Sequence, residues 1–320
     1  MRSLNLLLGA LCFCASLSAT AQEFPVKPVK IIVPFTPGGT PDLSARLIAE
    51  RLSAKWAQPV VVENRPGAGT MLGANLAAKS EPDGYTWLVA SDGTMVINPL
   101  GGNAPYEVFK DFTPVTQIAR VPFVLVVNSS LPVKNVTELV EYAKAHPGQV
   151  NFGSAGNGTP QHLAGEMVKQ AAGIDIRHVP YRGAVPAIAD MLGGRIQMFI
   201  GSPNTLVDYI GDGRLRALGS AGSSRTPSFP DLPTLSESMP GVAMDVWIGL
   251  FMPAGVPPAI VAKVNADVSA ILNDPEVKQT LAKQQFLDVA PTTPGELTQI
   301  VRNGQQHWGR IIREANIQLQ

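Results

Sequence analysis

Three turns in this sequence place small residues before a hydroxyl residue and a proline, a pattern suited to binding an anion. They lie at residues 35–41, 152–160 and 199–203, each after an apolar run. Each predicts a strand, a tight turn and a helix start, with Thr40, Thr159 or Ser202 as the N-cap and proline at the first helical position. Such a helix start offers unpaired N–H groups and a partial positive charge. We therefore predict a binding site for small carboxylates.

A single turn of this kind commonly serves only to connect a strand to a helix. Three in one chain, two of them rich in glycine, favour a shared anion site. A phosphate-binding loop does not fit, because no Gly-Lys-Ser/Thr follows either glycine-rich turn. No G-x-G-x-x-G motif occurs at residues 38–41 or 153–160 either. The pattern therefore does not predict nucleotide binding.

Strand-like and helix-like segments alternate along the chain, which predicts an α/β fold with mainly parallel sheets. Apolar runs at residues 30–33, 60–62 and 87–90 are separated by helical patterns, and the alternation resumes at residues 123–127. Long helical patterns at residues 258–273 and 294–315 close the chain. In open α/β sheets, ligands bind beyond the carboxyl ends of strands, which is where all three turns fall.

Two crossings divide the chain into a discontinuous first lobe and an inserted second lobe. The first crossing is predicted at Val121-Pro122, and the second in the Gly-, Ser- and Pro-rich stretch at residues 220–230. The expected domains are residues 22–121 with 223–320, and residues 122–222. We expect the lobes to hinge at these crossings, with the ligand between them.

The first 21 residues have the pattern of a secretory signal peptide. Arg2 comes before an apolar stretch, and Ala19-Thr20-Ala21 matches a cleavage site. Both cysteines, Cys12 and Cys14, fall within this segment, so the mature chain would contain no thiol. That composition is compatible with the periplasm. Removing the segment leaves 24 basic and 25 acidic residues without charged runs, which argues against nucleic-acid and anionic-membrane partners.

Motifs for catalysis or for metal binding are missing from the sequence. It contains no G-x-S-x-G and no H-E-x-x-H, and the predicted mature chain has no cysteine nucleophile. The four histidines show no spacing typical of metal ligands. We therefore expect a protein that is not an enzyme and that uses no metal or cofactor.

The order of several short motifs resembles one family over nearly the full length of the chain. The motifs are residues 33–35 (VPF), 38–39 (GG), Asp42, 62–69 (VENRPGAG), 82–86 (PDGYT), 98–99 (NP), 111–115 (DFTPV), 154–159 (SAGNGT), 162–165 (HLAG), 179–183 (VPYRG), 193–194 (GG), 215–218 (LRAL) and 253–255 (PAG). In this order they resemble the solute receptors of tripartite tricarboxylate transporters, the periplasmic binding proteins of the Bordetella-uptake-gene type.

The resemblance implies a type II periplasmic-binding fold whose two lobes close on a small organic acid and deliver it to a membrane permease. It also implies that backbone amides and water hold the ligand's carboxylates in the loops at residues 37–42 and 154–159. Two positions depart from the family pattern. Gln197 stands where members often have Asp, and residues 101–105 lack the usual aromatic or basic residues.

Several candidate residues have a structural interpretation beside the functional one. Asp42 is expected mainly to support its own loop, because a carboxylate facing an anionic ligand would weaken binding. His162 could contact the ligand or brace the loop. Tyr181 and Arg182 could contact the ligand or pack between the lobes, and Trp247 could line the cleft. The predicted ligand-binding residues are Pro37, Gly38, Gly39, Thr40, Asp42, Ser91, Thr94, Ser154, Ala155, Gly158, Thr159, His162, Tyr181, Gly201, Ser202 and Asn204.

The resulting hypothesis is a monomeric, periplasmic solute receptor. One alternative is a secreted hydrolase or transferase that acts on a small anionic substrate held by the same turns. Another is a sensory module, which the sequence does not separate from a transport receptor. Because no acidic partner for an ammonium group is evident in the sequence, we expect a plain or aromatic carboxylic acid rather than an amino acid.

Overall fold

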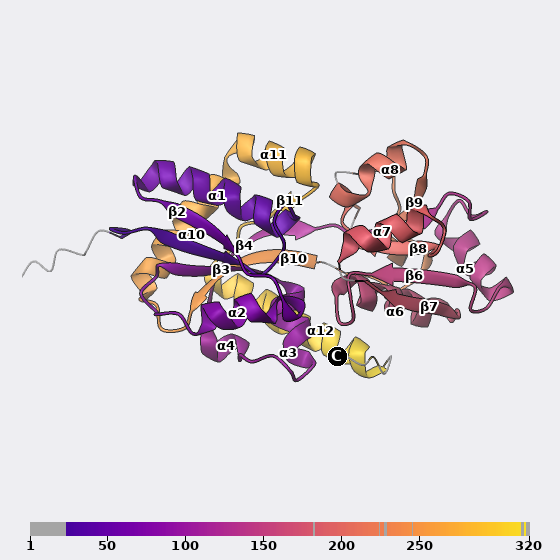
Figure 1. Cartoon of the computed structure of the whole chain (residues 1–320), viewed down its shortest axis with the longest axis horizontal. Helices are drawn as coiled ribbons and strands as arrows, with labels where there is room; N and C mark the ends of the chain where they lie inside the picture. Colours follow the sequence, from indigo (N-terminus) through magenta and orange to yellow (C-terminus); the bar gives the residue numbers. More distant parts are fainter. Residues whose placement is uncertain are drawn as a thin grey trace, which may run out of the picture.

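The computed structural model describes residues 24–181, 183–223, 225–226, 229–244, 246–314 and 317. The predicted signal peptide and Arg182 lie outside these residues. The described chain forms two lobes, each built around one β-sheet flanked by helices (Figure 1). Among the helices described, none has the length and apolar character that a membrane span requires.

The sheet of the first lobe has six strands in the order β11-β4-β10-β3-β1-β2. Strand β1 pairs in parallel with β2 and β3, whereas β10 runs antiparallel to both β3 and β4. The short β11 is antiparallel to β4. The strands are β1 (Val29–Val33), β2 (Val60–Asn64), β3 (Thr86–Ser91), β4 (Phe112–Val121), β10 (Val246–Pro253) and β11 (Asp288–Val289).

The sheet of the second lobe has five strands in the order β7-β6-β8-β5-β9. Strand β6 pairs in parallel with β7 and β8, and β5 lies antiparallel between β8 and β9. In each sheet most strands therefore run in one direction. The strands are β5 (Val124–Asn128), β6 (Val150–Ser154), β7 (Ile176–Pro180), β8 (Met198–Gly201) and β9 (Leu215–Ser220).

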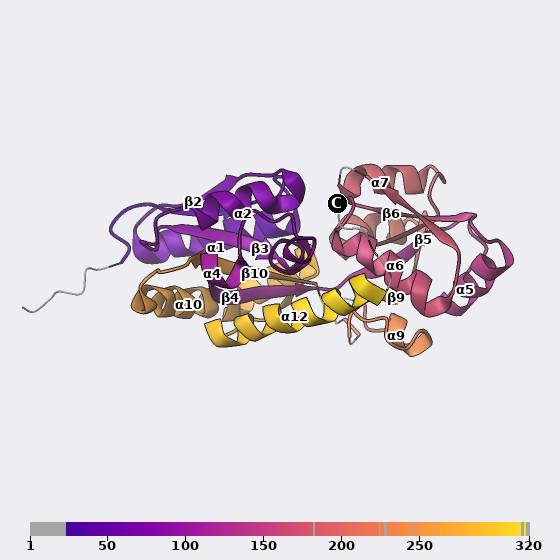
Figure 2. The same ribbon diagram turned by 90° about the horizontal axis from the view of Figure 1, so that it is seen from below.

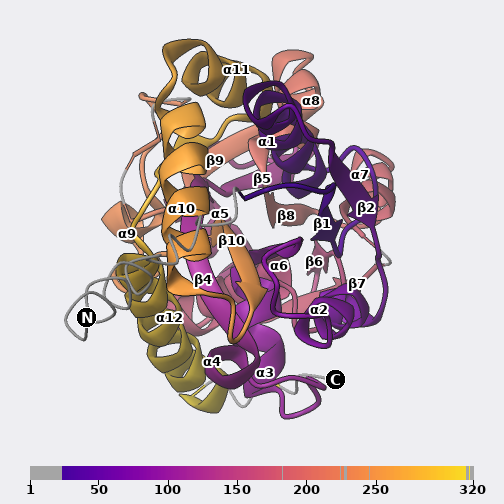
Figure 3. The same ribbon diagram turned by 90° about the vertical axis from the view of Figure 1, so that its left-hand side faces the viewer.

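Helices cover both faces of the first sheet. Figure 3 shows α1 and α10 on one face, and α2 and α12 on the other. Figure 2 shows α12 running along the first lobe toward the second. The helices of the first lobe are α1 (Thr40–Trp56), η1 (Ala68–Thr70), α2 (Met71–Ala78), η2 (Gly93–Ile97), α3 (Asn98–Leu100), α4 (Val108–Asp111), α10 (Pro258–Asn273), α11 (Pro275–Gln285) and α12 (Pro294–Glu314).

In the second lobe three helices, α5, α6 and α9, begin after a residue whose side chain caps them. The side chain of Asn135 accepts a hydrogen bond from the N–H of Glu138 at 2.8 Å, which fixes the start of α5. The helices of this part are α5 (Val136–Ala145), α6 (Pro160–Ala172), α7 (Ala184–Leu192), η3 (Pro203–Thr205), α8 (Val207–Gly211) and α9 (Leu235–Ser238).

The chain passes between the lobes at two places that lie side by side. After β4 ends at Val121, β5 begins at Val124 in the other sheet, and the return occurs between β9 and β10. At this junction Ala221 donates its N–H to the carbonyl of Phe123 at 2.7 Å, and Met244 donates to the carbonyl of Ala221 at 2.6 Å. The crossing at Phe123 and the two ends of the return, at Ala221 and Met244, are thus hydrogen-bonded together where the lobes join.

The segment that connects β9 to β10 also contacts the second lobe. Helix α9 packs against α5, and the N–H of Ser220 donates to the carbonyl of Pro233 at 2.8 Å. Residues 223–244, which we expected in the first lobe, therefore include a part that packs on the second.

The hydrophobic core follows the alternation of strand side chains. On β5, Val124 and Val126 pack into a cluster with Phe199 on one face of the sheet. Leu125 and Val127 face the opposite way and join the larger core. Because β5 is buried on both faces, it reads in the sequence as a continuous apolar run.

Candidate functional site

A cavity of about 480 Å³ lies between the two lobes. Its wall in the first lobe comes from the turn before α1, the loop around Gly67 and the segment after β3. In the second lobe it comes from the turn before α6, the start of α7 and the segment after β8. Nine of the predicted ligand-binding residues line it: Gly38, Gly39, Thr40, Ser91, Ala155, Gly158, Thr159, Ser202 and Asn204.

The turn before α1 is organised by Asp42, which is 1% exposed and does not line the cavity. Its carboxylate accepts hydrogen bonds from the N–H of Gly38 at 2.8 Å, from Arg46 Nε at 3.0 Å and from Asn64 Nδ2 at 2.8 Å. Burial alone would raise the pKa of Asp42, but these hydrogen bonds outweigh it and lower the pKa below its usual value. Asp42 is thus a charged support for the loop.

Gly38 borders the cavity, but its N–H is used to support the loop. Its φ of +83° is a conformation that favours glycine, and it directs the N–H toward Asp42. The N–H of Gly38, which we expected to contact a ligand, is therefore already paired in the structure.

The prediction that Thr40 caps α1 is wrong. Gly39 occupies the N-cap position without a side-chain cap, and Thr40 is the first residue of the helix. The hydroxyl of Thr40 instead accepts a hydrogen bond from Asn204 Nδ2 at 2.7 Å, which joins the two lobes across the cavity. Within the described chain, the N–H groups of Gly39 and Thr40 have no hydrogen-bond acceptor, so they are open to a guest.

The turn before α6 has the predicted cap. Thr159 accepts a hydrogen bond from the N–H of His162 at 3.4 Å and donates its hydroxyl to the carbonyl of Gly156 at 2.7 Å. Pro160 follows at the first helical position. The N–H of Gly158 donates to His162 Nδ1 at 3.2 Å and is therefore not free for a ligand, contrary to our expectation.

The N–H that remains at this helix start belongs to Gln161, which lines the cavity and was not predicted. It has no acceptor among the described residues. The sequence contained the information needed to predict this. Gln161 directly follows the Thr159-Pro160 pair and is the second residue of α6, where the backbone N–H has no partner within the helix.

Two stacked imidazoles support the α6 turn from behind. The rings of His162 and His178 lie 3.9 Å apart and nearly parallel, and His178 stacks in turn on Phe152. The Nε2 atom of His178 is 2.6 Å from the hydroxyl of Ser154. Burial, followed by the charges of His162 and Lys169, lowers the pKa of His178 to about 4, so the ring is neutral at neutral pH.

The other predicted site residues lie behind the cavity wall or hold other partners. Tyr181 donates its hydroxyl to Asp190 Oδ2 at 2.8 Å, and Thr94 pairs with the hydroxyl of Thr70 at 2.8 Å. At Gly201 an added Cβ would lie 2.3 Å from the ring of Phe199, so glycine there permits close packing. The predicted residues that do not line the cavity are Pro37, Asp42, Thr94, Ser154, His162, Tyr181 and Gly201.

The third turn does not begin an α-helix. Ser202 comes before η3, a single 3-10 turn, and makes no side-chain cap. Its hydroxyl is buried and lacks a hydrogen-bond partner among the described residues, and it lines the cavity. The helix start predicted there is present as this 3-10 turn, with Ser202 at the N-cap position and Pro203 as its first residue, and Ser202 borders the cavity.

Apolar side chains that we did not predict form much of the wall. Phe35, Phe123 and Phe199 line it together with Val246 and Ile248 of β10. The alternation of strand side chains turns Trp247 to the other face, where it borders a separate hollow. Trp247 therefore does not line the cleft.

Asp92 is the only ionisable side chain among the described residues that line the cavity. It follows β3 directly, at the start of η2. We did not predict Asp92 from the sequence, because we considered only the hydroxyls of its neighbours Ser91 and Thr94 as ligand contacts.

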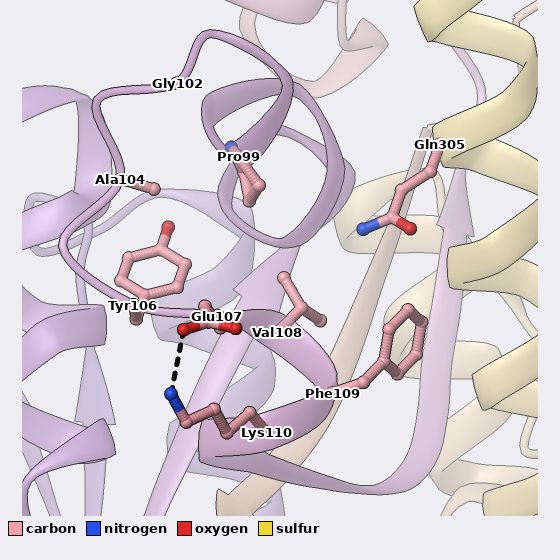
Figure 4. A pocket seen from close by; sticks show the side chains of 9 residues that line it. All are labelled: Pro99, Gly102, Ala104, Tyr106, Glu107, Val108, Phe109, Lys110 and Gln305. Carbon is pink, nitrogen blue, oxygen red and sulfur yellow. Dashed lines mark hydrogen bonds and ion pairs between the residues drawn. The ribbon is translucent and has the colours of Figure 1, made fainter.

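The two departures from the expected pattern lie away from the cavity. Gln197 accepts a hydrogen bond from the N–H of Asn151 at 2.9 Å and donates to the carbonyl of Gly194 at 3.0 Å, so it connects β6 to a turn. Gly102 and Ala104 border a different, surface-facing hollow of about 570 Å³ (Figure 4). There Lys110 and Glu107 form an ion pair of 2.9 Å.

The sequence matches the model of the tripartite tricarboxylate transporter family receptor over residues 44–317. It is 34% identical to the protein BugT of Bordetella pertussis, over 100% of this chain and 99% of BugT. Two solved structures from Rhodopseudomonas palustris are similar. Rpa4515 with adipate is 33% identical, with a TM-score of 0.86 and coverage of 92% of this chain and 99% of that chain. MatC with bound malate is 32% identical, with a TM-score of 0.79 and coverage of 90% and 100%.

The match therefore extends across both lobes and both sides of the cavity. The architecture described above is the two-lobed fold of periplasmic binding proteins. The chain belongs to the tripartite tricarboxylate transporter receptor family, whose members are periplasmic solute-binding proteins.

Proposed function

We propose that this protein captures a small organic carboxylate between its two lobes and delivers it to a membrane permease. The observation that carries the proposal is that the N-termini of α1 and α6, from opposite lobes, border one cavity. Both helix starts offer unpaired N–H groups and a partial positive charge. The cavity is also mostly apolar, which strengthens such contacts by excluding water.

In this proposal the N–H groups of Gly39 and Thr40 hold the ligand from the first lobe, and that of Gln161 holds it from the second. Thr159, Ser202 and Asn204 contribute side-chain contacts. The hydrogen bond between Thr40 and Asn204 belongs to the closed state, because it joins residues of different lobes. A ligand favours closure only by binding the closed state better than the open one.

We propose that residues 22–121 and the chain from β10 onward move as one body, and residues 122–222 as the other. The hinge would then lie at the hydrogen-bonded junction of Phe123, Ala221 and Met244. Adipate and malate, named with two similar structures, make small dicarboxylates the first ligands to test. The protein would act in the periplasm as a monomer, after removal of residues 1–21.

Titration calorimetry on the mature, ligand-stripped protein tests the proposal. The panel is adipate, malate, succinate, benzoate, aspartate and glutamate, and we expect micromolar or tighter binding of at least one acid. Thr40→Val should weaken that binding by about fivefold to tenfold, because it removes one hydrogen bond between the lobes. The matched control is Thr298→Val, which removes a hydroxyl bonded to the carbonyl of Pro294 in α12.

Two results would contradict the proposal. One is the absence of binding across the whole panel. The other is conversion of a panel acid into a product, followed by NMR during incubation, because a receptor releases its ligand unchanged.

A further inference from the structure

Two phenylalanine rings from different lobes stack on each other outside the ligand cavity. The ring centroids of Phe229 and Phe286 lie 5.8 Å apart, and the ring planes are inclined by only 17°. Both residues are half-buried, and neither is among the described residues that line the cavity. Aromatic rings at this separation attract each other beyond the effect of buried area alone. The pair, here called the interlobe stack, therefore stabilises the arrangement of the lobes in which the rings meet.

Phe229 belongs structurally to the second lobe. It lies in the loop after β9 and packs against the cluster that contains Val126 and Phe199. The same loop is held together by Arg225, which donates to the carboxylate of Glu237 in two hydrogen bonds of 3.0 Å and 2.8 Å. The ring of Phe229 therefore moves with the second lobe.

Phe286 is fixed by its backbone in the first lobe. Its N–H donates to the carbonyl of Ala282 at 3.1 Å and thereby closes the end of α11. The next residue, Leu287, is buried, and β11 then pairs with β4. Within the described chain, the ring of Phe286 packs in neither hydrophobic core. Its side chain thus contributes to the contact between lobes more than to the packing of its own lobe.

The backbone at Phe286 has a conformation that favours glycine. Its φ is +56°, and a left-handed residue directly after a helix is most often glycine. Phe286 has the largest side chain among the described non-glycine residues with a positive φ, the others being Ala57, Ala68 and Thr70. A bulky residue in this conformation is unfavourable for the backbone, so its presence requires a compensating contact. The stack on Phe229 is such a contact.

The interlobe stack lies on the side of the molecule where the lobes also meet at the cavity. Helix α11, which ends directly before Phe286, contacts η3 of the second lobe. Asn204 in η3 donates the hydrogen bond to Thr40 that joins the lobes at 2.7 Å. Figure 1 shows α11 at the edge of the first lobe, on the side of α8 in the second. A movement that separates η3 from α11 would therefore also separate the two rings.

We propose that the interlobe stack favours closure of the lobes before a ligand binds, which makes Phe286 a positioning residue for ligand binding. This inference rests on the proposed function and concerns how the same cavity is closed. A protein whose closed state is more populated binds its ligand more tightly, in proportion to that population. Because the rings do not line the cavity, the interlobe stack raises the affinity for every ligand by the same factor. Residues of the cavity wall, in contrast, determine which ligand is preferred.

Phe286→Gly tests the proposal, because it removes the ring and places at this position the residue that suits the backbone. Small-angle X-ray scattering on the ligand-free protein should show a larger radius of gyration than for the wild type. Calorimetry should show binding weakened by about threefold to tenfold, equally for each acid of the panel that binds. Phe286→Tyr, which keeps the ring, should restore both values. The matched control is Ala57→Gly at the exposed, left-handed end of α1, which should change neither.

Phe229→Ala removes the partner ring from the other lobe and should produce the same two changes. The double variant should bind no more weakly than the weaker single variant, because either change already abolishes the contact. Urea midpoints close to that of the wild type verify folding of each variant.

The possible failures are distinguishable. An unchanged radius with unchanged affinity in both single variants overturns the role of the interlobe stack. Losses that differ between acids overturn its action from outside the cavity, and additive losses in the double variant overturn the pairing of the two rings. If the wild type binds none of the panel acids, the proposed function fails. The scattering of the ligand-free variants still tests the interlobe stack in that case.

Discussion

Replacing Asp92 with asparagine should increase the free energy of unfolding of the ligand-free protein. The difference from the wild type should become larger as pH rises. The unfolded chain releases the proton of this carboxyl near the ordinary value of 3.8, whereas burial delays its release in the folded protein to about 7. Between these values the folded state binds one more proton than the unfolded state. The free energy of unfolding of the wild type therefore falls as pH rises through this interval.

The expected size follows from the width of the interval. One pKa unit corresponds to about 1.4 kcal/mol, so the full interval is worth about 4 kcal/mol. Above pH 7 both states are ionised at this site and the effect is constant. Between pH 5 and pH 8, only the two units from pH 5 to about pH 7 change the stability of the wild type. The free energy of unfolding of Asp92→Asn, relative to that of the wild type, should therefore increase by about 3 kcal/mol over this range.

Urea unfolding followed by tryptophan fluorescence measures this difference. Wild type, Asp92→Asn and the exposed control Asp212→Asn are each unfolded at pH 5 and pH 8, and the midpoints are converted with a common slope. The control should follow the wild type at both values. An advantage of Asp92→Asn that is the same at pH 5 and pH 8 would refute the reasoning, because it would mean that Asp92 is hydrated or paired in the folded protein.

Three further predictions concern the supports of the site. Burial is the main cause of the low pKa of His178. As pH falls from 6.5 toward 4, the unfolded chain therefore takes up a proton at this residue before the folded protein does, and the wild type loses stability. His178→Gln should therefore lose less stability than the wild type over that range, as measured by urea midpoints. Thr159→Val should cost about 0.5–2 kcal/mol and also weaken ligand binding, whereas the matched cap variant Asn135→Ala should cost a similar amount with unchanged affinity in calorimetry. Gly165→Ala should lower stability by about 1–3 kcal/mol in the same unfolding assay, because its Cβ would lie 2.1 Å from the ring of Phe152; an unchanged midpoint would contradict this packing.

Local sequence signals predicted much of the fold. The helix over residues 136–145 was predicted with the bounds of α5, and that over residues 258–273 with those of α10. Strand β10 was harder to recognise, because it is buried along its whole length and shows no alternation of polar and apolar residues. Its antiparallel insertion between β3 and β4 depends on long-range pairing, which no local pattern encodes.

The sequence predicted which turns form the site, but not which of their N–H groups are already hydrogen-bonded. The turns at Thr40 and Thr159 do meet at one cavity, as the motifs indicated. Which N–H groups remain open could not be predicted, because this depends on which side chains fold back onto the turns. Asp42 and His162 occupy the N–H groups that we had assigned to a ligand. The burial of Asp92 likewise depends on the packing of both lobes around the end of β3.

The open N–H groups at Gly39, Thr40 and Gln161 belong to the main chain, so a change of side chain does not delete them. Mutations elsewhere in the cavity wall can therefore change which ligand such a receptor prefers, while its backbone contacts to the carboxylate stay the same. Such a division would let duplicated copies of one gene diverge in nutrient preference through few substitutions, without rebuilding the anion-binding end.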